Sequence, residues 1–354
     1  MRSVDKFVSE TKKAVALISG GLDSLLAARV VMDQGIHVEG INFFTGFCVE
    51  GHTHAIRKKD RDKPKRNNAL WVAEQLGIKL HIVDIIDEYK DVVLNPRHGY
   101  GANLNPCLDC KIFMVRKARE WIEANGFDFI VTGEVIGQRP MSQRKDTLPV
   151  VQSESGVDDL LLRPLCAKIL PPTRPEREGW VRREALHDFS GRSRKPQMAL
   201  AARYGFEDYA QPAGGCCFLT DAQYSVKLAD LWQNRGVRDY DLDDILLLKV
   251  GRHLRPRPHF KLIVAREEGE SRYLQGYRRE YPSFDVVSHG GPLTLVDGAL
   301  GEGDLELAAR IVARYSQGRD SDAVELEFTE PGCDPRRLVV APLPPHELPA
   351  EWLL

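Results

Sequence analysis

The sequence predicts an α/β protein with a doubly wound parallel sheet, followed by a small C-terminal α+β domain. Two observations predict this fold. Short apolar runs alternate with helical patterns along the first part of the chain, and the first run, 14–18, leads through a glycine turn into a helix. Such alternation is typical of a parallel sheet covered on both faces. Beyond about residue 220 this alternation of apolar runs and helical patterns ends. We therefore place the first domain at residues 1–220 and the second at residues 221–354.

Apolar periodicity and turn residues place the elements of each domain. In the first domain we expect strands at 14–18, 38–44, 80–86, 127–131 and 160–166. We expect one helix that ends near residue 34 and further helices at 67–76, 112–125, 182–188 and 195–204. In the second domain we expect helices at 222–234 and 305–315 and strands at 245–257, 260–264, 290–295 and 324–328.

Length and charge limit the class of protein. The chain has 354 residues and a net charge of −2, so it can hold two domains and its bulk charge does not indicate a nucleic-acid partner. Two segments, 57–66 and 174–195, are basic and could contact RNA, although such runs are more often solvated loops. No apolar run approaches the ~20 residues of a membrane span, and the N-terminus lacks a signal-peptide core. We therefore expect a cytoplasmic protein that binds no membrane.

The stretch Ser19 to Ser24, SGGLDS, predicts an anion site between the first strand and its helix. Backbone N–H groups and the helix dipole attract negative charge at a helix N-terminus. Gly20 and Gly21 let the backbone approach a phosphate because no Cβ stands in the way. Ser19 and Ser24 can add hydroxyl donors. A bare carboxylate would repel phosphate, so Asp23 predicts a cation, usually Mg²⁺, that arrives with the phosphates.

These six residues match the SGGxDS motif of the PP-loop ATP pyrophosphatases, and the preceding strand and following helix fit as well. The resemblance implies the PP-loop, adenine nucleotide α-hydrolase-like fold and the use of ATP with Mg²⁺. Enzymes of this superfamily cleave ATP between the α and β phosphates and adenylate a substrate. Asn42 and Phe43 are candidates for the adenine side, because ligands of open α/β sheets lie at the carboxyl ends of strands.

The seven cysteines are an odd number in a chain without a secretion signal, which argues against a disulfide framework. Cys107 and Cys110 form a C-x-x-C at the start of a helix, which suits a redox pair, half of a zinc site or two buried small residues. Cys216 and Cys217 follow a Gly-Gly turn. Three thiolates from these two clusters would leave one iron of an iron–sulfur cluster without a protein ligand.

The polar segment 46–65 contains Cys48, His52 and His54. These three residues could bind a metal, but no second ligand cluster lies nearby in the sequence, so we expect a mobile loop. The cysteines outside the two clusters are expected to be structural or incidental: Cys48, Cys166 and Cys333. Cys166 follows a strand and suits the core.

Two further segments resemble the PP-loop tRNA thiolases. NPCLDCK, at 105–111, is similar to their NPCxxCN segment. TGEVIGQRPMSQ, at 132–143, is similar to the TGExxGQxxSQ segment of tRNA 4-thiouridine synthases, with one extra residue before the Ser-Gln. The resemblance implies ATP-site roles for Gly133, Glu134 and Gln138. It also implies a 4Fe–4S cluster, with zinc as the alternative metal, held by Cys107, Cys110 and Cys216, or by Cys217 in place of Cys216. Members without a cluster use two cysteines as persulfide carrier and resolving thiol.

The predicted function is an ATP-dependent sulfurtransferase that adenylates a uridine carbonyl in tRNA and replaces the oxygen with sulfur. The sulfur would be sulfide on the cluster or a persulfide on cysteine, supplied as sulfide or by a cysteine desulfurase. A homodimer is one expected assembly. The residues expected to act in catalysis are Asp23, Cys107, Cys110 and Cys216.

RNA contact is expected from the C-terminal domain or the basic loops. The 4-thiouridine synthases usually carry an RNA-binding region before the PP-loop, where this chain has only a short lead-in. The stretch 249–268, KVGRHLRPRPHFKLIVAREE, resembles a small domain appended to RNA-associated proteins. Two other functions stay open. One is a PP-loop sulfurtransferase that acts on a small molecule or carrier protein, and the other is a non-catalytic RNA- or nucleotide-binding module.

Overall fold

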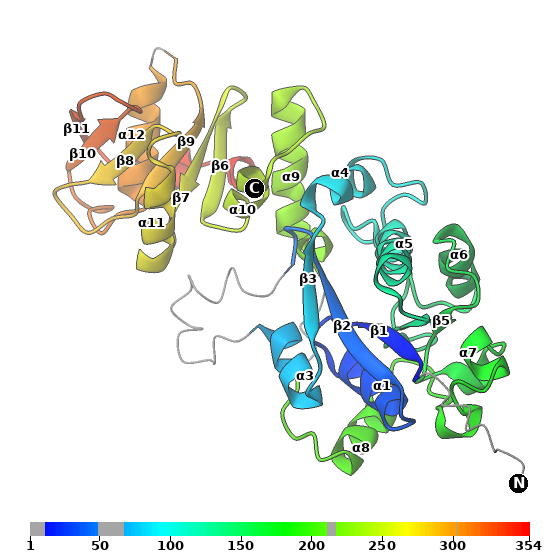
Figure 1. Ribbon diagram of the computed structural model, residues 1–354. Helices are drawn as coiled ribbons and strands as arrows, with labels where there is room; N and C mark the ends of the chain where they lie inside the picture. The colour runs from blue at the N-terminus through cyan, green and yellow to red at the C-terminus, as the bar shows by residue number, and fades with distance from the viewer. Residues whose placement is uncertain (1–10, 49–66, 211–216, 302) are drawn as a thin grey trace, which may run out of the picture. The chain divides into compact units, whose positions relative to one another are not determined.

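A computed structural model describes residues 11–48, 67–210, 217–301 and 303–354 (Figure 1). The chain forms two compact units. Unit 1 spans residues 1–45 and 66–214, and unit 2 spans residues 46–65 and 215–354. Within the described ranges, no helix is long and apolar enough to cross a membrane.

Unit 1 is built on a five-stranded parallel sheet with the order β3-β2-β1-β4-β5. Its strands are β1 (Lys13–Leu17), β2 (His37–Phe44), β3 (Leu80–Asp84), β4 (Phe129–Val131) and β5 (Leu161–Leu162). The chain moves outward from β1 to β3 and returns to the other side of β1 with β4, so its winding reverses between β1 and β4. In open α/β sheets ligands bind beyond the carboxyl ends of the strands at such a reversal. The predicted doubly wound sheet is confirmed.

Helices cover both faces of this sheet (Figure 1). On one face α3 (Asn68–Leu76) and α8 (Lys195–Arg203) pack against α1 (Leu22–Met32), and on the other α4 (Ile86–Leu94) and α6 (Thr147–Glu154) pack against α5 (Cys107–Asn125). Asn67 caps α3, since its Oδ1 accepts the N–H groups of Ala69 and Leu70. The core joins Leu25 and Leu26 of α1 to apolar residues of β1 and β4. Each such fully buried side chain contributes about 2 kcal/mol.

Two elements of unit 1 differ from the sequence prediction. The strand expected at 160–166 keeps only the two residues of β5 because Pro164, which has no backbone N–H, follows closely. The helix expected at 182–188 is wrong, since only Arg183–Ala185 form a 3₁₀ turn. The backbone N–H of His187 bonds instead to the carbonyl of Pro164. This segment therefore pairs with the end of β5 rather than coiling.

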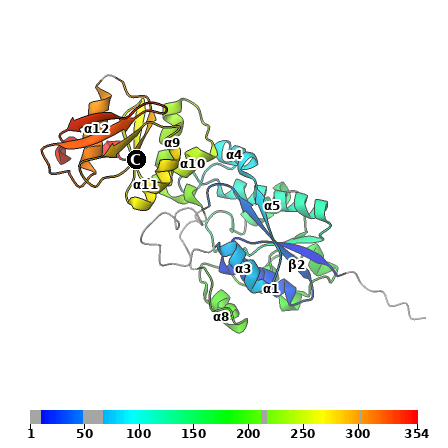
Figure 2. The same cartoon turned by 60° about the vertical axis from the view of Figure 1, so that its left-hand side comes forward.

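Unit 2 is built on a six-stranded sheet with the order β11-β10-β8-β9-β7-β6, in which neighbours are antiparallel. Figure 1 labels the strands of this unit, and Figure 2 labels its helices α9 to α12. Its strands are β6 (Arg252–Arg257), β7 (Phe260–Val264), β8 (Ser283–Val286), β9 (Thr294–Gly298), β10 (Val324–Thr329) and β11 (Arg336–Val340). Its helices of six or more residues are α9 (Ala222–Arg235), α10 (Leu242–Leu247), α11 (Glu268–Leu274) and α12 (Asp304–Arg314). Helix α12 packs on β8, β10 and β11. The predicted α+β module is confirmed.

The strand expected at 245–257 is wrong in its first half, because α10 occupies Leu242–Leu247 and β6 begins at Arg252. A capping box fixes the start of α10. Oδ1 of Asp241 accepts the N–H of Asp244, and the Asp244 carboxylate accepts the N–H of Asp241. The first apolar residues of the expected strand therefore belong to α10, whose inward-facing side chains are buried. The sequence does not predict β8 or β11. The strand expected at 290–295 overlaps β9 only at its last two residues, because β9 runs from Thr294 to Gly298.

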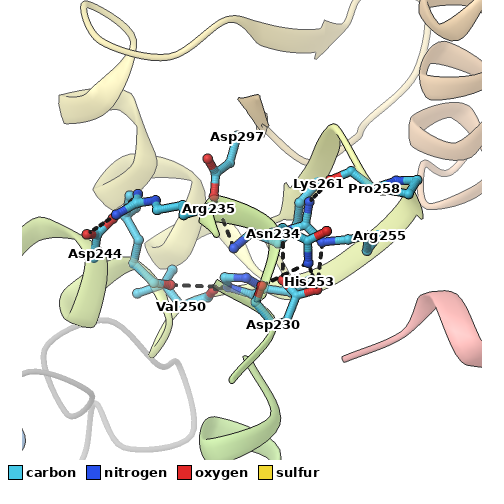
Figure 3. A network of polar contacts seen from close by, with 11 residues as sticks. Asp230, Asn234, Arg235, Asp244, Val250, His253, Arg255, Pro258, Lys261 and Asp297 are labelled. Atoms are coloured by element: carbon cyan, nitrogen blue, oxygen red, sulfur yellow. Dashed lines mark hydrogen bonds and ion pairs between the residues drawn. The ribbon is translucent and has the colours of Figure 1, made fainter. Parts of the chain in front are cut away.

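Several basic side chains of unit 2 form ion pairs with carboxylates of the same unit (Figure 3). Arg255 of β6 bonds both carboxylate oxygens of Asp230 on α9, at 2.6 and 2.7 Å. Nζ of Lys261, almost fully buried, lies 3.0 Å from a carboxylate oxygen of Asp297. Burial holds the pKa of His253 far below its ordinary value, so this side chain is neutral. These side chains make their contacts within unit 2 and stabilise it.

Candidate functional site

The SGGLDS loop lies where the winding of the sheet reverses, between the end of β1 and α1. Gly20 has a φ of +80°, and a Cβ there would lie 2.6 Å from the Cβ of Asn68, so only glycine fits. The Ser24 hydroxyl donates to the carbonyl of Gly21 at 2.8 Å, which closes the turn. Gly21, the N-cap residue of α1, has no side chain to accept the first N–H groups. The helix N-terminus is thus left for an anion.

The loop after β4 packs directly on this turn. A Cβ on Gly133 would lie 2.5 Å from the backbone carbonyl group of Asp23, so glycine permits the close approach. Further along the loop, Nε2 of Gln138 donates to Oδ2 of Asp23 at 2.6 Å. The structure therefore brings Gly133 and Gln138, two of the candidate ATP-site residues, to the loop that carries Asp23.

The carboxylate of Asp23 is only partly satisfied. Its Oδ1 is buried, and no hydrogen-bond partner for it exists among the residues that the structure describes. Burial raises the pKa of Asp23 above its ordinary value, although the Gln138 hydrogen bond and the charges of Arg194 and Arg139 act in the opposite direction. A buried carboxylate oxygen without a donor suits a hard divalent cation, so the residues present fit Mg²⁺ at this point.

Glu134 is the centre of a buried charge cluster. Its Oε2 accepts the hydroxyl of Thr132 at 2.8 Å and Nε of Arg163 at 3.1 Å, and Nζ of Lys111 lies 3.7 Å away. Burial alone would raise the pKa of Glu134, but the charges of Lys111 and Arg163 hold it below its ordinary value. Glu134 therefore stays ionised and ties the loop after β4 to α5.

The C-x-x-C pair lies in the first turn of α5, which begins at Cys107 rather than at residue 112. Both thiols are half-buried. The helix N-terminus stabilises thiolate, which is the nucleophilic and metal-binding form. The Cys107 thiol donates to the hydroxyl of Ser142 at 3.4 Å. Because Ser142 belongs to the same loop as Gln138, one segment, 132–143, contacts both the PP-loop and the cysteine pair.

Cys216, the first candidate for the third thiol of the predicted set, lies outside the described residues, as do His52 and His54. Cys217 belongs to unit 2, where it stands opposite Cys48 in an antiparallel bridge. No group of three or more His, Cys, Asp or Glu able to hold a metal ion occurs in the described part of the chain. Two thiols alone do not fit a cluster, so no step is derived through one.

The remaining sequence candidates have structural contacts. Nδ2 of Asn42 donates to the backbone carbonyl of Ile18 at 2.7 Å, which ties the end of β2 to the chain after β1. Phe43 is buried in the core. Cys166 is buried as expected and donates to the carbonyl of Glu134, and burial raises the pKa of its thiol to about 11.

Sequence reasoning missed two side chains of this site. Gln197 on α8 reaches Gln138, and Arg194 at the start of α8 acts on Asp23. The sequence suggests Lys111 as a cation for the α phosphate, and in the structure it lies beside Glu134. Arg194 lies in a basic segment that the sequence flags only as a possible RNA contact. No local motif distinguishes Gln197, because its partner lies 59 positions away along the chain.

A five-stranded parallel sheet of this order, with a glycine turn and an aspartate at the winding reversal, is typical of α/β nucleotide-binding proteins. Residues 9–168 match the family described as "Thiamine biosynthesis protein (ThiI)", and residues 251–353 match the "NFACT protein RNA binding domain". The part of the chain that carries the SGGLDS loop is therefore similar to the PP-loop tRNA thiouridine synthases.

Curated relatives match only part of the chain. The tRNA-specific 2-thiouridylase MnmA of Petrotoga mobilis is 32% identical over 131 residues, which are 35% of this chain and 36% of the relative. The protein of the same name from a Marinomonas species is 33% identical over 129 residues, 35% of this chain and 32% of the relative. The chain thus spans about a third of the length of these relatives.

Solved structures show more distant likeness. A 4-thiouridine synthetase in complex with RNA and ATP is 22% identical, covers 56% of this chain and 54% of that chain, and has a TM-score of 0.33. The C-terminal part of a fibronectin/fibrinogen-binding protein from Streptococcus suis is 13% identical, covers 44% of this chain and 75% of that chain, and has a TM-score of 0.25. Scores this low say nothing about function.

Proposed function

We propose that the protein is an ATP-dependent sulfurtransferase that converts a uridine of tRNA to thiouridine. The observation that carries this proposal is the double contact of the segment 132–143. Through Gln138 it bonds Asp23 of the PP-loop, and through Ser142 it accepts a hydrogen bond from Cys107. A loop that activates a substrate with ATP and a thiol pair that can deliver sulfur therefore meet on one short segment of unit 1.

ATP would bind with its phosphates at residues 19–24. The N-terminal N–H groups of α1 and the hydroxyls of the two serines would hold the phosphates, and Arg139 and Arg194 would balance negative charge. Mg²⁺ held at Asp23 would neutralise charge on the pyrophosphate leaving group. The uracil carbonyl oxygen attacks the α phosphorus and pyrophosphate departs, which leaves AMP bonded through the former carbonyl oxygen. The carbonyl oxygen, which leaves poorly by itself, can then leave as part of AMP.

Sulfur would arrive at the Cys107–Cys110 pair. As hydrosulfide it attacks the activated ring carbon, and AMP leaves with the original oxygen. As a persulfide on one cysteine it attacks in the same way, and the other thiol then releases thiouridine and leaves a Cys107–Cys110 disulfide, which an external thiol must reduce. A cluster-dependent route would need a third thiolate, for which Cys216 is the first candidate and Cys217 the second.

The colour of the protein separates these routes. A cluster-dependent enzyme purified without oxygen is brown, contains about one cluster per chain and loses it in Cys107→Ala. A colourless protein that thiolates tRNA with a cysteine desulfurase as donor, but not with sulfide alone, would instead support the persulfide route. Loss of iron in Cys216→Ala but not in Cys217→Ala would assign the third ligand.

RNA binding is proposed for unit 2. Residues 251–353 match a family named for RNA binding, and the curated relatives are named for 2-thiouridine formation in tRNA. We propose a catalytic domain at 1–220 and an RNA-binding domain at 221–354, near the boundary of the compact units at residue 214. The target uridine must be unpaired or flipped so that its carbonyl can reach the site.

Mass spectrometry of tRNA nucleosides tests the proposal. A strain that lacks the protein should lose one thiolated nucleoside and regain it on complementation, and the nucleoside identifies the C2 or C4 position. An unchanged profile would favour sulfur transfer to a small molecule or carrier protein. If purified protein also released no pyrophosphate from ATP, a non-catalytic RNA- or nucleotide-binding module would be the better interpretation.

A further inference from the structure

A buried glutamine on α8 extends the polar chain that begins at Asp23. Gln197 has no exposed surface, and its Nε2 donates to Oε1 of Gln138 at 2.9 Å. Gln138 in turn donates from Nε2 to Oδ2 of Asp23 at 2.6 Å. Burying an amide costs free energy unless it is hydrogen-bonded, so a chain of two amides ending on a carboxylate needs this pairing.

The direction of this chain is set by the charge of Asp23. An ionised carboxylate only accepts hydrogen bonds, so Gln138 must present its NH₂ group to Asp23. Its Oε1 then faces α8 and must accept, and Gln197 meets this need with its own NH₂ group. Because the helix fixes Gln197, it fixes Gln138, and Gln138 fixes which carboxylate oxygen of Asp23 is occupied.

Three unsatisfied atoms gather around the same carboxylate. Oδ1 of Asp23, Oε1 of Gln197 and Nε of Arg194 are buried and lack a hydrogen-bond partner among the described residues. Arg194 is the N-cap residue of α8, and with Arg139 it acts electrostatically on Asp23. A cation at Oδ1 together with an anionic group at Arg194 would satisfy two of these three atoms.

We infer that Gln197 is a positioning residue of this site, which through Gln138 holds the Asp23 carboxylate so that Oδ1 faces the cation that accompanies ATP. This inference rests on the proposed function, because it takes Mg²⁺–ATP to be the ligand. Gln197 itself touches neither ligand in this arrangement. It acts by fixing the direction of the hydrogen bonds.

The substitution Gln197→Glu reverses that direction. A glutamate at this position cannot donate from an ionised side chain, so Gln138 would turn its NH₂ group toward α8 and its Oε1 toward Asp23. Oδ1 of Asp23 would then no longer be held toward the cation, whereas the N–H groups at the start of α1 that face the phosphates would be unchanged.

The test is calorimetric titration of the full-length protein with ATP in the presence of Mg²⁺ and again in the presence of EDTA. Gln197→Glu should bind Mg²⁺–ATP about tenfold more weakly than wild type. Its affinity for metal-free ATP should equal that of wild type. Met198→Ala, whose side chain is half exposed on the same helix, is the matched control and should match wild type. An equal loss of affinity for metal-free ATP would show a merely structural role and overturn the inference.

Two further outcomes keep the test decisive. If Gln197→Glu does not fold, Gln197→Asn replaces it, because it is too short to reach Gln138 and adds no charge. It should lose about tenfold in affinity for Mg²⁺–ATP and none for metal-free ATP, and unchanged affinity for Mg²⁺–ATP would overturn the inference. Wild-type protein that binds no Mg²⁺–ATP at any pH would contradict the proposed function itself, whereas normal wild-type binding with an unaltered Gln197→Glu variant contradicts the inference alone.

Discussion

Cys107 donates a hydrogen bond to Ser142 at 3.4 Å, across 35 positions of sequence. This contact joins the first turn of α5 to the loop after β4, which through Gln138 also holds Asp23 of the PP-loop. A displacement of this loop would therefore move both the sulfur side and the ATP side of the site. The predictions below separate the contributions of the two sides.

Replacement of Asp23 should abolish the ATP-dependent half of the reaction. Asp23→Asn keeps the shape of the side chain but removes the charge that holds the cation, so pyrophosphate release should fall about a hundredfold or more. Asp33→Asn, at the other end of α1, is the matched control and should retain activity. Pyrophosphate release from ATP by the two variants gives the comparison, and an active Asp23→Asn would refute the role of this carboxylate.

The same carboxylate should make the stability of the ATP-free protein depend on pH. The pKa of Asp23 is raised in the folded state by burial, so its ionised form destabilises the fold. Stability should fall as pH rises from the ordinary aspartate value, 3.8, through the folded-state value, and Asp23→Asn should reduce this fall. Urea unfolding of both proteins at several pH values measures the difference. Equal slopes against pH would rule out a perturbed Asp23.

Replacement of either cysteine of the C-x-x-C should separate ATP cleavage from sulfur transfer. Cys107→Ser and Cys110→Ser should lose thiouridine formation and keep pyrophosphate release, because the proposed role of the thiols is in sulfur transfer and not in adenylation. Cys333→Ser, at an exposed cysteine of unit 2, should behave like wild type. Nucleoside analysis and pyrophosphate assays on the same samples separate the steps. Full thiolation by Cys107→Ser would remove this thiol from the mechanism.

Glu134→Gln should destabilise unit 1. The change leaves the guanidinium of Arg163, which is 4% exposed, without its buried counter-charge, at a cost of about 3 kcal/mol. Because the pKa of Glu134 is lowered in the fold, its contribution is complete above the ordinary value of 4.5 and is lost as pH falls through the folded-state value. Glu178→Gln, in an exposed pair with Arg174, should change stability little. Similar unfolding midpoints for the two variants would show that the buried pair is not stabilising.

Charge reversal on β6 should weaken tRNA binding. Arg252 and Arg257 are exposed at the two ends of this edge strand, whereas Arg255 between them is paired with Asp230. Arg252→Glu with Arg257→Glu should lower affinity for all tRNA sequences and reduce the salt dependence of binding, since each lost phosphate contact removes about one unit of slope. Arg272→Glu with Arg279→Glu, at two exposed arginines elsewhere in unit 2, is the control of the same charge change. An equal loss with the control would show that only bulk charge matters.

The sequence predicts the loop proposed to bind ATP better than it predicts the contacts that join this loop to the rest of the site. The PP-loop is local, because residues 19–24 carry the turn, the helix start and the aspartate together. The cap of α3 at Asn67 and the apolar strands of the parallel sheet follow from local patterns in the same way. The run beginning at Ile245 misleads, because a short buried helix and a buried strand have similar composition, and only the Asp241–Asp244 capping box separates them.

The contacts that join the site are long-range and carry no local signal. Gln197 reaches Gln138, and Glu134 reaches both Lys111 and Arg163, across intervals that depend on the order of the strands. The motif resemblance identifies Gln138 and the cysteines as candidates, but it does not indicate that α8 supports Asp23. Tertiary geometry supplies that information, because amide and carboxylate partners are chosen by position in the fold rather than by spacing in the chain.

The central claim is that one protein couples ATP cleavage at the α phosphate to sulfur transfer into tRNA. Purified protein should be incubated without oxygen with Mg²⁺–ATP, sulfide and unmodified tRNA, and AMP and thiouridine counted in the same reaction. The account predicts that both products form together in equal amounts and that neither forms in Asp23→Asn. AMP and pyrophosphate produced at the wild-type rate with no thiolated nucleoside, under every sulfur donor tried, would contradict it.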